Sequence, residues 1–333
     1  MLITVVIITI GIALLFDFLN GMNDAANSIA TIVSTKVLSP KIAVAWAAFF
    51  NFAAAAIFGV HVATTIGKGI VNPQIINEYF IFSALIGAVF WTHYCTHFGL
   101  PISVSHALIG GMIGPALVSG GTEFLVMSGI IKVLVFIVLS PVIGFLLGHI
   151  IMVITLHLFK RKTPRRVDSL FHVMQLLSSA VFSLGHGSND AQKTMGIIAV
   201  LLYSTKMIGP DFYVPIWVII AAYSAIAIGT LAGGWRVIRT LGVGLTDLKP
   251  VHGFCAETAG AITIIGASLF GIPVSTTHTI TGSIMGVGAT KRLSAVRWNL
   301  ATHIVWAWVL TIPCTMIVSA AIYLVLRLFI SIP

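Results

Sequence analysis

Charged residues are scarce in this chain. They make up 8% of its 333 residues, with 9 acidic side chains against 18 lysines and arginines. A soluble domain carries about 25% charged residues, so this composition excludes one. Cysteine is also rare: the sequence contains only Cys95, Cys255 and Cys314, and their spacing fits no metal-binding motif. We expect the three cysteines to pack as small apolar side chains.

Long apolar runs are what the sequence has instead. Hydrophobic residues make up 58% of it, and several runs reach the roughly 20 residues that a transmembrane helix needs. The runs cover 2–19, 42–60, 79–98, 129–159, 213–235 and 299–330. A transmembrane β-barrel would show short segments of alternating polarity instead. We therefore predict an all-α, multi-pass membrane protein. The run 2–19 lacks the flanks of a cleaved signal peptide, so we predict that it is retained as the first helix.

The net charge of +9 could suggest a nucleic-acid partner in a soluble protein. In a membrane protein, lysine and arginine gather in cytoplasmic loops. The densest cluster is KRKTPRR at 160–166, in the middle of the chain. We place this cluster in the cytoplasm, facing the bilayer surface, and predict no nucleic-acid partner.

Two motif pairs recur along the chain. GMNDAANSIA (21–30) matches GSNDAQKTMG (187–196), and GLPISVSHALIGGMIG (99–114) matches GIPVSTTHTITGSIMG (271–286). Because the pairs keep their order and similar offsets, they indicate an internal duplication. We predict a first repeat at 1–159, a basic cytoplasmic linker at 160–170 and a second repeat at 171–333.

Equivalent loops of the two halves differ in charge. The loop 115–125 has no lysine or arginine, whereas its counterpart 287–297 has three. The segment 63–78 has one, whereas 235–250 has three. Equivalent loops with opposite positive bias belong on opposite sides of the membrane. The repeats are therefore predicted to have inverted topology, which is common in secondary transporters with a site at the repeat interface.

The motifs also predict breaks in the helices. Glycine and asparagine in 21–27 favour an unwound segment after the first apolar run. Pro101 disfavours helix at the preceding residue and is suited to a helix start. Ser103 and Ser105 would then lie in a first turn, where free backbone N–H groups bind anions such as phosphate.

Two aspartates stand out as candidate site residues. Asp24 and Asp190 occupy matched positions in the two motifs, and a charge at the bilayer centre costs about 2.5–3.5 kcal/mol or more. A cation bound between them would neutralise them and could also contact an oxyanion. Alternatively, the two aspartates lie at loop ends near the membrane–water interface, where a charge costs little free energy. For His186 a proton or ligand role competes with a structural one, and for Glu257 a site role competes with an interfacial carboxylate at a helix start.

Serine and histidine also lie close together in Ser105/His106 and Ser275/His278, which raises an intramembrane hydrolase as an alternative. Neither pair has an orienting acid in its local motif, so we predict packing roles for the histidines and no enzymatic activity. A channel is a further alternative, since paired half-helices also occur in pores.

The four motifs GMNDAAN, GSNDAQK, LPISVSH and IPVSTTH resemble those of the inorganic phosphate transporter (PiT) family, in particular its bacterial low-affinity type. The resemblance covers nearly the whole chain. It implies two inverted repeats, broken helices and re-entrant hairpins in about 10–12 membrane segments, and a homodimer. It also implies that phosphate binds between the halves, with these assignments: for coupling cations Asp24, Asp190, Asn23, Asn27, Asn189 and Glu257; for phosphate Ser103, Ser105, Ser275, Thr276 and Thr277. We add Gln192 and Lys193 of the second Asn-Asp motif as further candidates for phosphate binding.

The chain departs from the sodium-coupled members of that family at two positions. Lys193 stands opposite Asn27 in the repeat, where those members carry asparagine, and Asn51 replaces a glutamate of the animal members. The resemblance therefore implies a secondary active importer of phosphate in a bacterial inner membrane, driven by protons and without a bound cofactor. Transport of phosphate as a complex with a divalent metal stays open, as do sodium coupling and sulfate as the substrate. Lys193 could also snorkel out of the site.

Overall fold

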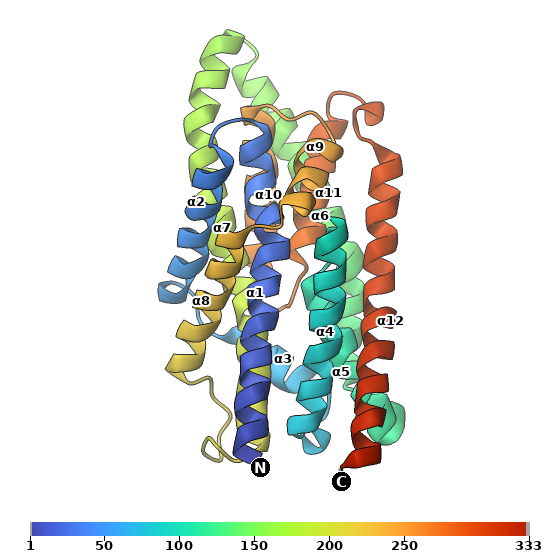
Figure 1. Cartoon of the computed structure of the whole chain (residues 1–333). Coiled ribbons are helices and arrows are strands. Elements are labelled where there is room, and N and C mark those ends of the chain that lie inside the picture. Colours follow the sequence, from blue (N-terminus) through green and yellow to red (C-terminus); the bar gives the residue numbers. More distant parts are fainter. Residues whose placement is uncertain (1, 331–333) are drawn as a thin grey trace.

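The computed structural model describes residues 2–330, which form helices joined by short connections and contain no strand (Figure 1). The helices of the first half are α1 (Leu2–Ser34), α2 (Pro40–Ala53), α3 (His61–Gly69), α4 (Glu78–Phe98), α5 (Val104–Gly120) and α6 (Met127–Phe159). Those of the second half are α7 (Pro164–Ser204), α8 (Ile216–Ala232), α9 (Trp235–Gly244), α10 (Pro250–Leu269), α11 (Thr276–Ala289) and α12 (Trp298–Phe329). Short 3-10 helices lie at Ala54–Ala56, Pro73–Ile75, Gly121–Phe124 and Leu293–Ala295.

The all-helical, multi-pass class is confirmed. In residues 2–330, 6 helices are long and apolar enough to cross a membrane, or up to 8 when each bent pair counts as one span. The bends lie between α2 and α3 (85°) and between α8 and α9 (69°). The predicted 10–12 membrane segments include re-entrant hairpins, and residues 2–330 contain 12 α-helices, several of them too short to cross a membrane alone.

The second half repeats the order of the first: a long helix, a bent pair, two helices joined by a short break, and a long helix. Equivalent helices run in opposite directions (Figure 1), since α1 begins at the lower end and α7 begins at the upper end. The connections 115–125 and 287–297 accordingly lie at opposite ends, as their charges predict. The chain positions that bound the two repeats stay a prediction.

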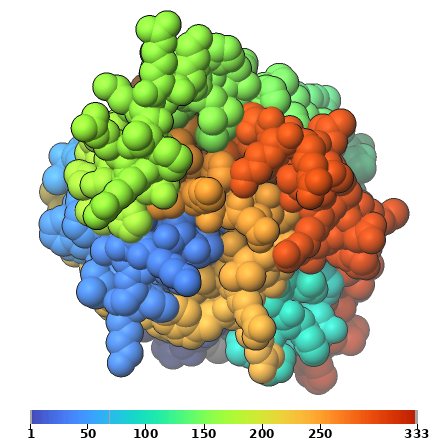
Figure 2. Space-filling model, turned by 90° about the horizontal axis from the view of Figure 1, so that it is seen from above, coloured from blue at the N-terminus to red at the C-terminus, as the bar shows by residue number. Residues whose placement is uncertain are grey.

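The connection between the halves is shorter than the predicted linker 160–170. Helix α6 ends at Phe159 and α7 begins at Pro164, so only 160–163 lie between them. Proline suits the first helical position because its missing N–H would be unpaired there, which lets Arg165 and Arg166 join the first turn. Together with the connections 35–39, 245–249 and 290–297, this segment makes up the basic upper face (Figure 2).

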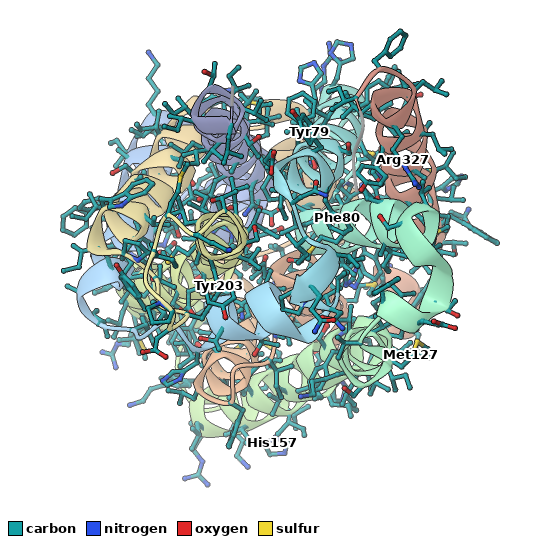
Figure 3. All side chains as sticks on the ribbon, turned by 90° about the horizontal axis from the view of Figure 1, so that it is seen from below. Tyr79, Phe80, Met127, His157, Tyr203 and Arg327 are labelled. Carbon is teal, nitrogen blue, oxygen red and sulfur yellow. The ribbon has the colours of Figure 1, made fainter. Side chains whose placement is uncertain are left out.

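The connections at the lower end (Figure 3), 70–77, 121–126 and 205–215, contain a single lysine, Lys206, and no arginine. Arg327 of α12 donates to Val118 O at 3.1 Å, and Tyr323 packs edge-on against Phe80 of α4 with ring centroids 6.1 Å apart. These contacts tie α12 to the α4–α5 pair. The positive-inside rule predicts that the upper face is the cytoplasmic one and that the lower face lies outside.

The predicted unwinding at the Asn-Asp motifs is wrong, because α1 and α7 continue through 21–27 and 187–193 without a break. A helix satisfies its own backbone groups, which the membrane interior demands. The glycines serve close packing instead. A Cβ on Gly21 would lie 2.1 Å from Ile226 O of α8, and one on Gly187 would lie 2.5 Å from Asn51 O of α2.

The breaks occur instead before α5 and α11, but not at the proline. Helix α5 starts at Val104, three residues after Pro101, and α11 starts at Thr276. The short helices then pack closely on the long ones. A Cβ on Gly110 would lie 2.5 Å from Ile312 O of α12, and one on its repeat partner Gly282 would lie 2.2 Å from Pro141 O of α6.

Candidate functional site

The centre of the site is a group of buried polar side chains from three helices. Asp24 comes from α1, Asp190 from α7 and Thr276 from the first turn of α11, and none is more than 2% exposed. Thr276 Oγ1 lies 3.0 Å from Asp190 Oδ2 and 3.3 Å from Asp24 Oδ2. The matched aspartates of the two halves therefore meet at one hydroxyl group. They lie deep inside the protein and not near the membrane–water interface.

Thr277 links the same centre to the break before α5. Its Oγ1 lies 3.2 Å from Asp24 Oδ1 and 2.9 Å from Ile102 O, and Asn27 Nδ2 donates to it at 3.0 Å. A hydroxyl donates only one hydrogen bond at a time, so Thr277 can bond to the Asp24 carboxylate or to the Ile102 carbonyl. A rotation of this one group would change the contacts of Asp24 without any movement of the backbone.

Lys193 is part of the site and does not snorkel to a surface. Its side chain is buried, and its ammonium group donates to Asp190 Oδ1 and, at 3.1 Å, to Val274 O. The spacing of three residues on a helix predicts this pairing. A buried lysine that keeps a carboxylate and a carbonyl as acceptors is a fixed positive charge beside Asp190.

The orientation of the His186 ring is set by a chain of hydrogen bonds. Thr230 Oγ1 donates to Ile226 O at 2.9 Å and accepts from Asn51 Nδ2 at 3.0 Å. Asn51 Oδ1 is thereby directed to His186 Nδ1, 3.1 Å away. An amide oxygen only accepts, so this contact requires a proton on Nδ1. The other ring nitrogen, Nε2, lies 3.1 Å from Asp190 Oδ2 and 4.0 Å from Asp24 Oδ2.

The two predicted helix starts are capped by serine. Ser103 Oγ accepts from His106 N at 3.3 Å, and Ser275 Oγ accepts from His278 N at 3.2 Å. Ser105 is 7% exposed, and its hydroxyl forms no hydrogen bond with another residue in 2–330. Ser103 and Ser275 therefore orient the helix ends, while Ser105 has a hydroxyl that can bind a ligand.

Three predicted asparagines share one pattern. Asn23 Nδ2 donates to Thr96 at 2.8 Å, and its repeat partner Asn189 donates to Ser268 at 2.8 Å. Asn27 donates to Thr277, as described above. The amide oxygen of each asparagine is buried and accepts no hydrogen bond from the described residues. Oxygen atoms of this kind are what a hard cation binds.

Two predicted residues lie away from the centre. Gln192 Oε1 accepts from Val62 N at 2.8 Å at the start of α3, so it caps that helix rather than facing Asp24. Glu257 is fully buried in the second turn of α10, which rules out an interfacial helix start. Its carboxyl group accepts hydrogen bonds from Thr31 at 2.6 Å and Ser178 at 2.5 Å. Thr31 lies on α1 two helical turns beyond Asp24, so Glu257 does not reach the centre of the site.

The structure also reveals polar residues that the sequence analysis missed. Thr230 lies in the run 213–235 and Asp17 in the run 2–19, so both were absorbed into predicted spans. A signal existed for Asp17, since it is one of only 9 acidic residues and interrupts an apolar run. Thr230 carried no such signal, because hydroxyl residues bond to their own helix in many membrane spans.

The two histidines of the serine motifs pack together. The His106 and His278 rings lie 4.8 Å apart edge to face, and Trp308 stacks on His278 at 3.7 Å. In residues 2–330 neither imidazole ring is hydrogen-bonded to a serine hydroxyl. The hydroxyls of Ser103 and Ser275 accept from the backbone N–H groups of His106 and His278 instead. The geometry that a Ser–His nucleophile needs is therefore not formed.

The fold and the site define a multi-pass membrane transporter: two halves of opposite direction enclose one buried polar centre at their interface. The chain belongs to the phosphate transporter family, whose family description matches residues 20–319. It is 57% identical over 314 residues to a probable low-affinity inorganic phosphate transporter of Rhizobium meliloti, covering 94% of both chains. It is 40% identical over 318 residues to one of Bacillus subtilis, covering 95% of both.

A solved structure supports the same assignment. The chain resembles a sodium-dependent phosphate transporter with a TM-score of 0.88 and 28% sequence identity, covering 98% of this chain and 100% of that one. These relatives are transporters and not enzymes, as the sequence predicts. They also confirm the resemblance on which the assignment of site residues was based, although the role of each residue is a separate question.

Proposed function

We propose that this protein imports inorganic phosphate across a bacterial inner membrane as a secondary active, proton-coupled transporter. Phosphate as substrate is supported by the family and by the printed names of its relatives. Alternating access around the buried centre would expose the site to each side in turn. The bacterial inner membrane and a homodimeric assembly rest on the resemblance alone and stay predictions.

The observation that carries proton coupling is the contact between Lys193 and Asp190. The centre holds two carboxylates, and the ammonium group of Lys193 balances one of them. In a transporter that used two sodium ions at matched sites, the second-half ion would need an oxygen ligand where Lys193 stands. An ammonium group offers hydrogens but no lone pair, so it occupies that place as a permanent cation.

Asp24 then needs one mobile cation, and the contacts of the site favour a proton. His186 Nε2 lies within hydrogen-bond distance of Asp190 Oδ2, while its Nδ1 is held as a donor by Asn51. One proton must occupy the contact between Nε2 and the carboxylate for it to be attractive. The centre can therefore hold and release a proton without moving its backbone.

Phosphate would bind beside this centre at the start of α5. Ser105 offers a hydroxyl that bonds to no described residue, and the first turn of a helix offers N–H groups and a favourable dipole. The hydroxyls of Thr276 and Thr277 now lie within hydrogen-bond distance of the two carboxylates. They would contact phosphate only after the carboxylates have been neutralised, which would couple phosphate binding to cation binding.

Sodium coupling is the second candidate, because the similar solved structure is a sodium-dependent phosphate transporter. The carboxylate of Asp24 and the unpartnered oxygen of Asn27 would be its ligands. A divalent ion carried as cargo with phosphate also fits by spacing, since ligand atoms of Asp24, His186 and Asp190 lie within 4.8 Å of one another.

Transport by purified protein in liposomes tests the proposal. Radiolabelled phosphate uptake is measured under an inward proton gradient without sodium, and separately under an inward sodium gradient without a pH difference. We expect accumulation above the external concentration only in the first case, and collapse of that accumulation by a protonophore. Protein-free liposomes and unlabelled sulfate as competitor serve as controls. Accumulation driven by sodium alone would reject proton coupling, and equilibration without accumulation would indicate a channel.

A further inference from the structure

One buried acidic side chain is not used by the central site. Asp17 lies on α1 and is 0% exposed. Asn20 Nδ2 is 3.5 Å from its Oδ1, and its Oδ2 has no hydrogen-bond partner in residues 2–330. A carboxylate without a charged partner is expensive to bury in a membrane protein. An acidic residue at this position therefore suggests a functional role, because it does not stabilise the fold.

Three further polar atoms lie around the Asp17 carboxyl group. They come from Asn20 on α1, from Thr194 on α7, which lies beside Asp17, and from Tyr223 on α8, which interacts with it electrostatically. Asn20 Oδ1, Thr194 Oγ1 and the Tyr223 hydroxyl are buried and, like Asp17 Oδ2, lack a hydrogen-bond partner among the described residues. The Asn20 amide and the Thr194 hydroxyl thus lie close enough to interact with the carboxyl, but Asp17 forms no ion pair among the described residues.

The position of Asp17 places it on the outer side of the central site. It precedes Asp24 by seven residues on α1, a distance of about 10 Å along a helix axis, and α1 rises from the lower end (Figure 1). Thr194 follows Asp190 by four residues on α7, which descends towards that end. Because the lower face is the outer one, a cation that enters from outside would reach Asp17 before Asp24.

The other half of the fold shows that an acid is not needed there for packing. By the alignment of the two Asn-Asp motifs, Asp17 corresponds to Ser183, and Thr194 corresponds to Ser28. Both serines are buried at 1% exposure or less. The equivalent position in the second repeat thus holds a small neutral residue. The carboxyl group at position 17 is therefore specific to the first repeat and is not required by the packing that the two repeats share.

We propose that Asp17 binds the coupling proton on its way from the outside to the central site. This inference rests on the proposed proton-coupled function and names the residue that takes up the proton. The proton passes from water to the carboxylate, and no other bond forms or breaks. The protonated carboxyl can donate to Thr194 Oγ1, or to Asn20 Oδ1 once that amide turns over. Lys193 and Asp190 of α7 and Tyr223 of α8 are the charged and titratable groups that face Asp17.

In the described conformation Asp17 has no access to water, because it is fully buried. The residues one turn on either side, Ala13 at 1% and Asn20 at 2%, are also buried. Protonation from outside therefore requires the alternate, outward-open conformation. A neutral Asp17 would allow the helices to close over it again, whereas an ionised one would oppose closure. The proton would then be required for the step that carries phosphate inward.

The variant Asp17→Asn tests this proposal, with Asp17→Glu as the conservative variant. Asp211→Asn, which makes the same change in the exposed connection 205–215, is the matched control. Two activities are compared in liposomes: exchange of labelled for unlabelled phosphate at equal concentrations, and accumulation under an inward proton gradient. Proton uptake that accompanies phosphate entry is followed with an internal pH dye.

We expect Asp17→Asn to keep phosphate exchange but to lose accumulation and the accompanying proton uptake, while Asp17→Glu and Asp211→Asn retain all three. Wild-type accumulation and proton uptake in Asp17→Asn would overturn the inference. Loss of exchange together with accumulation would also overturn it, because Asp17 would then be part of the scaffold or of the phosphate site. A wild-type protein that ignores the proton gradient would reject the proposed function itself, and the inference with it.

Discussion

Lys193 and Asp190 form an ion pair within one turn of α7, and both side chains are buried in the middle of the membrane protein. A buried pair gains stability only when both partners are present, because either partner alone is an uncompensated buried charge. The pair also changes the local charge from two negative groups to one. The two matched aspartates are therefore chemically different, although the repeat makes them look equivalent in sequence.

Lys193→Asn should abolish proton-driven accumulation of phosphate and introduce a dependence on sodium. The substitution restores the asparagine of the first half and provides an oxygen ligand beside Asp190 in place of a fixed charge. Uptake into liposomes under separate proton and sodium gradients measures both effects. Lys206→Asn is the matched control, since Lys206 lies in a turn with φ 59° that asparagine tolerates. Unchanged proton-driven uptake in Lys193→Asn would contradict this role.

Asp24→Asn and Asp190→Asn should both abolish accumulation, but they should differ in stability. Asp190→Asn leaves the Lys193 ammonium group without its counter-ion, which costs about 3–5 kcal/mol in buried pairs. Asp24→Asn removes a carboxylate that has no lysine partner, so the protein should unfold near the wild-type temperature. Thermal unfolding in detergent and uptake in liposomes check the two expectations. Wild-type accumulation by either variant would show that its carboxylate is not needed for coupling.

Ser105→Ala and Thr277→Val should weaken phosphate binding without preventing folding. A hydrogen bond to a charged group contributes about 1.5–3 kcal/mol, which corresponds to roughly a 10- to 100-fold rise in the phosphate concentration for half-maximal uptake. Thr302→Val serves as the control, because Thr302 is exposed on α12 and bonds only to its own helix. A phosphate-bound structure with the anion only at the basic loop 160–166 would refute these assignments.

Gly21→Ala and Gly187→Ala should destabilise the protein. The added methyl groups would meet backbone oxygen atoms at 2.1 Å and 2.5 Å, which forces the crossing helices apart, and overpacking of this kind costs about 1–3 kcal/mol or more. Gly11→Ala in the same helix meets nothing within 4 Å and should leave the unfolding temperature unchanged or raise it slightly. Equal unfolding temperatures for all three variants would show that the close contacts do not matter for stability.

Several features were predictable from the sequence because they depend on local rules. Apolar runs of spanning length predict the membrane class, and charge differences between matched loops predict that the halves run in opposite directions. Hydroxyl residues at a helix start were also predicted, although Ser103 is the N-cap residue of α5 and not part of its first turn. The pairing of Lys193 with Asp190 follows from three residues of spacing on a helix.

Other features depend on contacts between segments far apart in the chain, which local patterns do not specify. Glycine next to asparagine predicts unwinding, but packing of Gly21 against Ile226 keeps α1 intact. Gln192 looks like a ligand of the site until α3 folds against it. The meeting of Thr276 with both aspartates joins three helices, and the grouping of Asp17 with Tyr223 joins α1 to α8. Sequence determined the helices and their polar residues; tertiary packing decided which polar groups face one another, because burial removes water as an alternative partner.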